Sequence, residues 1–146
     1  MLSGKTTLVL NFIKEIIESE DMHLLFFDFD IRKEKVLQNI NNDFIKTNLY
    51  INNTHSISVR EILEQTKKIN NKRKLDLIII DDLRFIQADK SMLLSRKEEE
   101  NYILKQLNLL SKELNITIII TSIVRGKDLT IMSLNEKYNI NIEDYT

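Results

Sequence analysis

The stretch Leu75–Asp82, LDLIIIDD, joins a short run of apolar residues to two carboxylates. Two similar runs occur in the chain, HLLFFDFD at His23–Asp30 and NITIIITSI at Asn115–Ile123. Short apolar runs that are rich in Ile or Phe and bounded by polar residues are typical of strands buried on both faces of a parallel sheet. We therefore predict that the three runs form adjacent parallel strands.

Helical patterns alternate with these runs, which predicts an α/β fold with a mostly parallel sheet. Two helices are expected to begin at Ser-x-x-Glu capping boxes, Ser58–Glu61 and Ser95–Glu98. The expected order is helix, strand, helix, short strand, helix, strand, helix, strand. Ligands of such folds lie beyond the carboxyl ends of the strands, where the acids of this chain fall. The apolar positions at helical spacing are Leu8, Phe12 and Ile16; Val36, Leu37 and Ile40; and Ile103, Leu107, Leu110 and Leu114.

Length and composition predict one domain over residues 1–146, and no element is assigned to the tail of residues 127–146. The chain has 21 basic and 22 acidic residues and a net charge of -1, so we expect only local contacts with nucleic acid. It has no cysteine, which fits a reducing compartment, and we expect the cytoplasm. No apolar run is long enough to span a bilayer, and no membrane partner is expected. The basic run Lys67–Lys74, KKINNKRK, could contact phosphate or DNA, but we interpret it as a solvated loop after a helix.

The N-terminal stretch MLSGKTT contains the second half of a phosphate-binding loop, G-x-x-x-x-G-K-[ST]. In such a loop the backbone N–H groups of Ser3, Gly4 and Thr7 would surround phosphate oxygens. Lys5 would neutralise the terminal phosphates and the Thr6 hydroxyl would ligate Mg²⁺. Taken alone, the five residues also fit a capped helix start.

Carboxylates at strand ends supply the other candidates for this site. Asp81 at the tip of LIIID would hold the water shell of Mg²⁺, although such a residue can also simply open a turn. Asp28 and Asp30 lie two positions apart at another strand end, where either a catalytic role or a surface position fits the spacing.

Four further polar residues have weaker claims to a site. His23 and His55 lack companions at ligand spacing, so we interpret them as a residue at the start of a strand and a turn residue. Arg84 and Arg125 follow strand ends and could contact phosphate, but a solvent-facing arginine is the commoner case.

The order of these segments resembles the RecA-like motor domain of the DnaB family of replicative helicases. The resemblance covers Ser3 to about Gly126 and lies in the collinear order of its parts. These are SGKTTLVLNFI for the phosphate loop, LLFFDFDIRKEKVLQNI for the catalytic strand, LYINNTHSISVREILEQTKKI for a short strand and capped helix, LDLIIIDDLRFIQ for the magnesium strand, and EENYILKQLNLLSKELNITIIITSIVRG for the phosphate-sensing strand.

The resemblance implies a three-layer RecA-like P-loop NTPase core, incomplete here, that binds ATP and Mg²⁺. It implies a homo-oligomeric helicase ring, a hexamer when complete, that acts on single-stranded DNA, with Asp30 as the catalytic base. Three positions depart from the family: Asp30 replaces a glutamate, Asp82 a tyrosine and Ile123 the glutamine that senses the γ-phosphate. Hydrolysis is therefore in question.

Two alternatives remain at this stage. The chain could be a non-catalytic remnant that folds without hydrolysing ATP, or another RecA-like ATPase such as a recombinase or a KaiC-like protein. We also expect a fragment in which the strand that feeds the phosphate loop is missing beside the IIITS strand. That would leave an apolar strand edge open to aggregation or to pairing with another chain.

Overall fold

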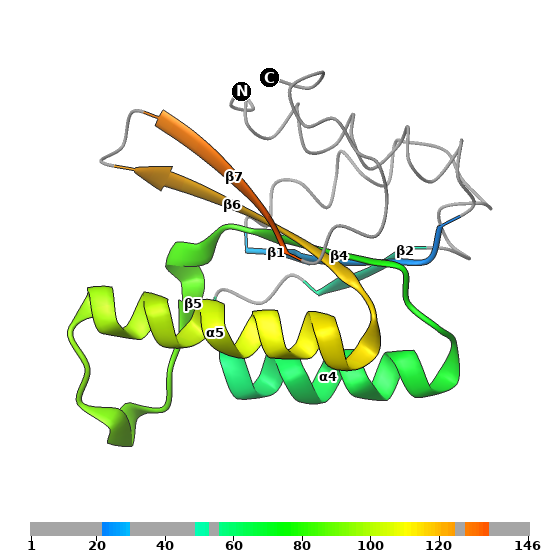
Figure 1. Cartoon of the computed structure of the whole chain (residues 1–146), viewed down its shortest axis with the longest axis horizontal. Coiled ribbons are helices and arrows are strands. Elements are labelled where there is room, and N and C mark those ends of the chain that lie inside the picture. The colour runs from blue at the N-terminus through cyan, green and yellow to red at the C-terminus, as the bar shows by residue number, and fades with distance from the viewer. Residues whose placement is uncertain (1–21, 30–48, 53–55, 125–127, 135–146) are drawn as a thin grey trace.

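The three apolar runs form the middle of a five-stranded sheet (Figure 1). The computed structural model describes residues 22–29, 49–52, 56–124 and 128–134. The strand order is β2-β1-β4-β6-β7, in which the first four strands are parallel and the last is antiparallel. The predicted adjacency of the three runs is confirmed. The strands are β1 (Leu24–Asp28), β2 (Leu49–Asn52), β4 (Leu77–Asp81), β6 (Thr117–Val124) and β7 (Asp128–Leu134).

The central strand β4 is buried on both faces, as its continuous apolar sequence predicts. Ile78 and Ile80 belong to the core between the sheet and the helices, while Leu77 and Ile79, on the opposite face, are equally buried. Burying one such side chain is worth about 1.5–3 kcal/mol, so this strand is a main source of stability.

Helices α4 (Val59–Lys72) and α5 (Arg96–Leu114) lie side by side on one face of the sheet (Figure 1). Ile62 of α4 and Ile103 and Leu107 of α5 are fully buried in the core. The burial in α5 confirms the helical spacing predicted for residues 103–114. The described residues thus form a sheet and one helical layer. The helices predicted around residues 8–16 and 36–40, which would supply the third layer, lie outside the described residues.

Both predicted helix starts are confirmed. The Ser58 hydroxyl accepts a hydrogen bond from the Glu61 N–H at 3.1 Å, and the Ser95 hydroxyl accepts one from the Glu98 N–H at 3.2 Å. Each bond satisfies a backbone donor that has no partner within its helix. At the other end of α5, Asn115 ends the helix in the left-handed conformation, with φ 54°.

The basic run Lys67–Lys74 is not a loop, and that prediction was wrong. Helix α4 continues to Lys72, so only the last two residues of the run, Arg73 and Lys74, lie beyond it. Ile69 explains the extra turn, because it follows Ile62 by seven residues and packs against the same core. On the outer side of this turn, Lys67 forms an exposed ion pair with Glu113 of α5 at 3.5 Å.

The prediction of an open edge beside β6 is also wrong. Strand β7, within the expected tail, pairs antiparallel with β6 from Ile118↔Leu134 to Val124↔Asp128. The backbone groups on this side of β6 therefore bond within the chain and do not offer a template for another strand. The sequence analysis assigned no element to this segment.

Shorter elements connect β4 to α5. They are the 3₁₀ turns η1 (Leu83–Phe85) and η2 (Lys90–Met92) and the strand β5 (Ile86–Gln87), which pairs with β3 (Ile57–Ser58) in a separate parallel pair. Among the described residues, no helix is both long and apolar enough to cross a membrane.

His23 joins the beginnings of two strands. It lies one residue before β1, as predicted, and is 2% exposed. Its Nδ1 lies 2.9 Å from the Lys74 carbonyl oxygen, and its backbone N–H donates to an Asp76 carboxylate oxygen at 2.9 Å. Burial lowers the pKa of the imidazole, more than the hydrogen bond to the Lys74 carbonyl raises it. The neutral ring is therefore the form that the folded chain favours.

We predict that the free energy of unfolding falls as the pH drops below about 6.5, the ordinary value for histidine. The folded-state pKa lies below that of the unfolded chain, so the unfolded chain takes up the proton first, and the stabilisation is complete only above this pH. Urea denaturation at pH values on both sides of 6.5 measures the effect. His23→Gln should lower the pH slope, while His55 remains in both proteins. Equal slopes would contradict the prediction.

Candidate functional site

Three polar residues lie level with one another at the carboxyl edge of the parallel sheet. Asp28 of β1 is paired in register with Asp81 of β4, and Asp81 with Thr121 of β6. Just beyond them, the Phe29 N–H donates to the Asp81 carbonyl oxygen at 3.3 Å. Asp81 therefore occupies the strand tip at which the sequence placed it, the edge where ligands of open α/β sheets bind.

The Asp81 carboxylate is buried and accepts a hydrogen bond from Thr121. Asp81 is 2% exposed and Thr121 is 1% exposed. The Thr121 hydroxyl oxygen lies 2.5 Å from Asp81 Oδ1 and 3.4 Å from the Ile80 carbonyl oxygen. A distance near 2.5 Å is typical of a hydroxyl that donates to a charged carboxylate. A buried carboxylate needs such donors, since its charge is costly to remove from water.

The next residue, Asp82, organises the turn η1. Its carboxylate is fully buried and accepts from the Arg84 backbone N–H at 2.8 Å and from the Arg84 Nε at 3.1 Å. The hydrogen bond with Asp82 raises the pKa of Arg84. The guanidinium carbon also lies 5.5 Å from the centre of the Phe85 ring, which in turn is 5.5 Å from the Phe29 ring. The Arg84 side chain is 52% exposed but forms an ion pair with Asp82.

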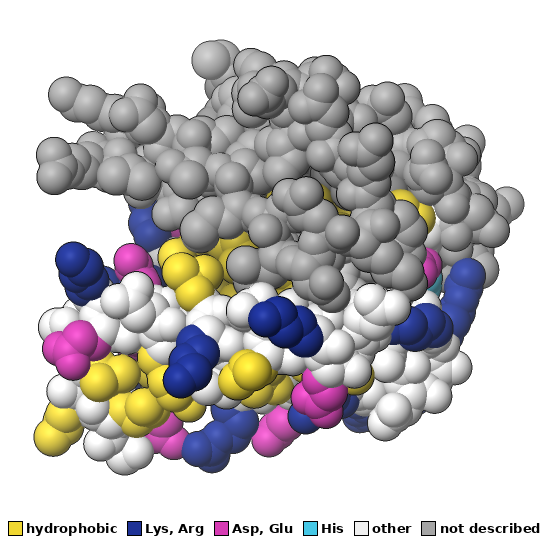
Figure 2. All heavy atoms as spheres, in the orientation of Figure 1, with side chains coloured by type: hydrophobic (Ala, Val, Ile, Leu, Met, Phe, Trp, Pro, Cys, Tyr) yellow, Lys and Arg dark blue, Asp and Glu magenta, His cyan; other side chains and the backbone are white. Residues whose placement is uncertain are grey.

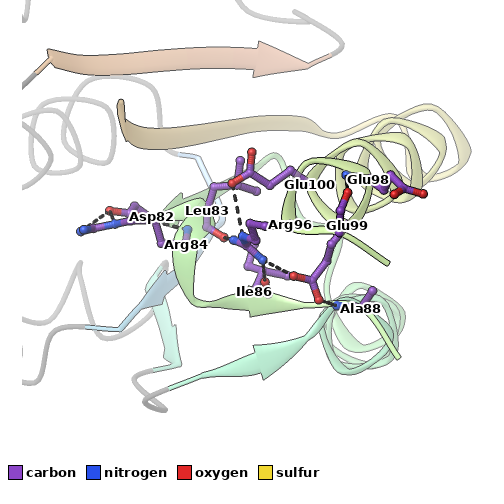
Figure 3. Close-up of polar contacts among 10 residues, drawn as sticks. Asp82, Leu83, Arg84, Ile86, Ala88, Arg96, Glu98, Glu99 and Glu100 are labelled. Carbon is purple, nitrogen blue, oxygen red and sulfur yellow. Dashed lines mark hydrogen bonds and ion pairs between the residues drawn. The ribbon is translucent and has the colours of Figure 1, made fainter. Parts of the chain in front are cut away.

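Arg96, at the start of α5, holds the segment that follows Asp82 (Figure 3). Its guanidinium donates to the carbonyl oxygens of Leu83 at 3.1 Å and Ile86 at 3.0 Å. It also forms ion pairs with Glu99 at 2.5 Å and Glu100 at 3.3 Å. We call Arg96, these two carbonyl groups and Glu99 the Arg96 clamp.

Glu99 extends the clamp to the residue after β5. Its second carboxylate oxygen accepts from the Ala88 backbone N–H at 3.0 Å, so that one glutamate bonds both Arg96 and the end of the connecting segment (Figure 3). The hydrogen bond from Arg96 and then that from Ala88 lower the pKa of Glu99. The clamp therefore joins both ends of the η1–β5 segment to the first turn of α5.

The other predicted site residues fall beyond what the structure describes. Ser3, Gly4, Lys5, Thr6, Thr7 and Asp30 lie outside the described residues, as do His55 and Arg125. For Asp28 and Ile123 the structure describes the strand but not the side chain.

Thr121 and Arg96 are the residues that the sequence analysis missed. A signal for Thr121 was present, because Thr117 and Thr121 flank three isoleucines in this strand and, four residues apart, point to the same face. The residues opposite these threonines on the next strand could not be predicted from the sequence, because the cross-strand register is set by the fold. No comparable signal marks Arg96, which resembles any charged residue of a helical first turn.

The donor set at the carboxyl edge suits Mg²⁺, which prefers oxygen ligands and often keeps several waters while binding one or two carboxylates. Asp81 supplies such a carboxylate. The described part of the chain holds no group of three or more His, Cys, Asp or Glu residues that could hold a metal by itself.

An open groove of about 570 Å³ lies elsewhere, between the start of α4 and the segment after β5. It is lined by residues such as Ser58, Arg60 and Asp89, and the last two form an ion pair at 2.6 Å. Basic and acidic side chains are interspersed over the described part of the face shown in Figure 2, without an extended basic patch. We therefore keep the carboxyl edge as the candidate site.

Comparisons with known proteins agree with the resemblance. The family described as "DnaB-like helicase C terminal domain" matches residues 33–129. The chain is 23% identical to the replicative DNA helicase DnaC of Bacillus subtilis (strain 168) and 22% identical to the replicative DNA helicase DnaB of Geobacillus stearothermophilus, each over 147 residues. These matches cover 82% of this chain and 32% of each helicase, so the chain spans about a third of their length.

Two solved structures show that the fold is that of RecA-like ATPase domains. A DnaB-like replicative helicase, studied with its interactions with primase, superposes with a TM-score of 0.62 at 18% identity, over 79% of this chain and 35% of the helicase. The second structure, a separate ATPase domain, gives a TM-score of 0.62 at 16% identity, over 86% of this chain and 57% of that domain. At these identities the two structures establish the fold alone.

We predict that Arg96→Met lowers the free energy of unfolding by about 1–2 kcal/mol, because two backbone carbonyl groups and Glu99 lose their shared donor. Urea denaturation measures the loss. Lys97→Met, a like substitution at the exposed neighbouring position, should change stability by less than about 0.5 kcal/mol. Equal losses in both variants would show that the clamp does not stabilise the segment.

Proposed function

Because the chain belongs to the family of DnaB-like helicase C-terminal domains, we propose that it binds ATP with Mg²⁺ as part of the motor of a replicative DNA helicase. The observation that carries the proposal is the buried Asp81 carboxylate at the carboxyl end of β4, level with Asp28 and bonded to Thr121. A carboxylate at this edge is suited to ordering water around a nucleotide-bound magnesium ion.

The phosphate-binding part of the proposal rests on the N-terminal sequence. Ser3, Gly4 and Thr7 would donate backbone N–H groups to phosphate oxygens, and Lys5 would neutralise the terminal phosphates. Thr6 and Asp81 would hold Mg²⁺ through the threonine hydroxyl and the water shell. The bound ion would supply positive charge that offsets the charge of the phosphates.

Asp30 is proposed as the catalytic base. It would accept a proton from the water that attacks the terminal phosphate, as a carboxylate near that water can. Its side chain is one methylene shorter than the glutamate that the family resemblance places here. We therefore expect hydrolysis to be slow.

The larger assembly is proposed from the family. A ring of identical subunits, hexameric in the intact family, would surround single-stranded DNA and unwind the duplex during replication in the cytoplasm. The chain spans about a third of the replicative helicases that it resembles, so these functions would need the rest of such a protein.

A catalytically inactive remnant is the second candidate. The observation that favours it is Ile123, which stands in β6 where the resemblance expects a phosphate-sensing glutamine. An isoleucine side chain has no hydrogen-bonding group with which to sense phosphate. ATP binding without turnover would support this candidate.

We predict that the chain of 146 residues binds ATP weakly, with a dissociation constant of about 1 mM or higher. Ser3–Thr7 contain only half of the loop pattern and so offer few N–H donors. Saturation-transfer NMR with ATP, in excess Mg²⁺ and in EDTA, measures the affinity. Asp81→Asn should remove the gain that Mg²⁺ gives, because the amide is uncharged.

The same titration can contradict the proposal in two ways. ATP binding that does not respond to Mg²⁺, or that responds equally in Asp81→Asn, would exclude the proposed metal role of Asp81. Tight binding that depends on Mg²⁺ would show instead that the phosphate site is completed by residues other than those proposed.

We also predict that Asp30→Glu raises ATP turnover, by up to about a hundredfold, because a carboxylate misplaced by roughly 1 Å can cost that much in rate. Asp30→Asn should abolish turnover while leaving ATP affinity unchanged, since an amide cannot take the proton. Single-turnover rates measure both effects in a protein extended upstream to complete the phosphate loop and downstream to complete the motor domain. If Asp28→Asn stopped hydrolysis and Asp30→Asn did not, the base would lie two residues earlier.

A further inference from the structure

We infer that Thr121 is a positioning residue for Asp81, whose hydroxyl fixes the direction in which the carboxylate faces a nucleotide-bound Mg²⁺. The inference rests on the proposed function and assigns a role to a residue that the family resemblance does not single out. Thr121 acts through Asp81 and would not itself touch the metal or the nucleotide.

The first support is the placement of the single hydroxyl proton. The Thr121 oxygen lies 2.5 Å from Asp81 Oδ1 and 3.4 Å from the Ile80 carbonyl oxygen, so the shorter contact receives the proton. A charge-assisted bond of this length is about twice as strong as a neutral one. The hydrogen bond restrains rotation of the Asp81 carboxylate about the Cβ–Cγ bond. It thereby sets the direction of both carboxylate oxygens.

The second support is the rigidity of the donor. Thr121 lies in β6 between two strands, paired in register with Asp81 of β4 on one side and Ile131 of β7 on the other. A β-branched side chain has few χ1 rotamers, and this one is 1% exposed. The hydroxyl is therefore held in place before any ligand binds.

The competing explanation is purely structural, because a buried carboxylate needs a donor for stability alone. On that explanation the loss of the hydroxyl would weaken folding and leave the response to Mg²⁺ unchanged. Partners of metal-binding groups have a different effect, since their loss typically costs about 10- to 100-fold in metal affinity. The response of ATP binding to Mg²⁺ separates the two explanations.

The test compares Thr121→Val, which replaces the hydroxyl by a methyl group, with Thr121→Ser, which keeps it. Thr117→Val is the matched control, because Thr117 is equally buried at the opposite end of β6, level with Leu77. Each variant is titrated with ATP in excess Mg²⁺ and in EDTA, and circular dichroism measures its folded fraction. The readout is the ratio of the two ATP affinities.

We expect Thr121→Val to reduce this ratio by about tenfold. Thr121→Ser and Thr117→Val should stay close to the parent chain. If Thr121→Val does not fold, Thr121→Ala takes its place, because it also lacks the hydroxyl but brings no methyl group against the carboxylate.

Asp81→Asn, titrated in parallel, separates the inference from the proposed function. A loss of the Mg²⁺ response in Asp81→Asn with none in Thr121→Val would overturn the role of Thr121 and leave the function standing. An unchanged response in Asp81→Asn would overturn the function, and the role of Thr121 with it. An equal loss in Thr117→Val would overturn the role of Thr121 by showing that the effect comes from general destabilisation of β6.

Discussion

The parallel register of β1, β4 and β6 is the constraint on which the rest of the structure depends. Because these strands run in the same direction and begin at matched levels, their carboxyl ends meet at a single edge. That alignment places Asp28, Asp81 and Thr121 in one row. It also lets a threonine 40 residues away in sequence supply a donor to the buried Asp81 carboxylate. A shift of β6 by one residue relative to β4 would turn its side chains to the other face and break this contact.

The segment that leaves this edge is held by charged groups and not by apolar packing alone. Asp82 bonds the backbone and side chain of Arg84 within the turn η1, while the Arg96 clamp joins the same segment to α5. The two clusters are local and consist of internally matched charges. They fix the path of the chain after Asp81. A fixed path helps the Asp81 carboxylate to keep one orientation at the binding edge.

Membership of the DnaB-like helicase family agrees with this arrangement, and the fold is shared with RecA-like ATPase domains. The departures from the family lie close to the proposed chemistry, at Asp30, Asp82 and Ile123. Of these, Asp82 has a described structural role as the cap of η1. The charged residue at this position therefore serves the turn, whether or not the site hydrolyses ATP.

The sequence by itself determined the features that depend on near neighbours. Continuous apolar runs predicted β1, β4 and β6, and serines at the right distance from glutamates predicted the starts of α4 and α5. These patterns can be read because side-chain direction repeats every two residues in a strand and every three to four in a helix. The position of Asp81 at a strand tip followed from the same local pattern.

Only the tertiary structure decided which distant segments meet. It paired β7 with β6, carried α4 on to Lys72 over the core, and brought Thr121 to Asp81 and Arg96 to the turn after Asp82. The physical reason is that these contacts join separate elements of the chain, and their energies depend on register and burial. Neither quantity exists in the sequence until the strands have paired and the helices have packed against them.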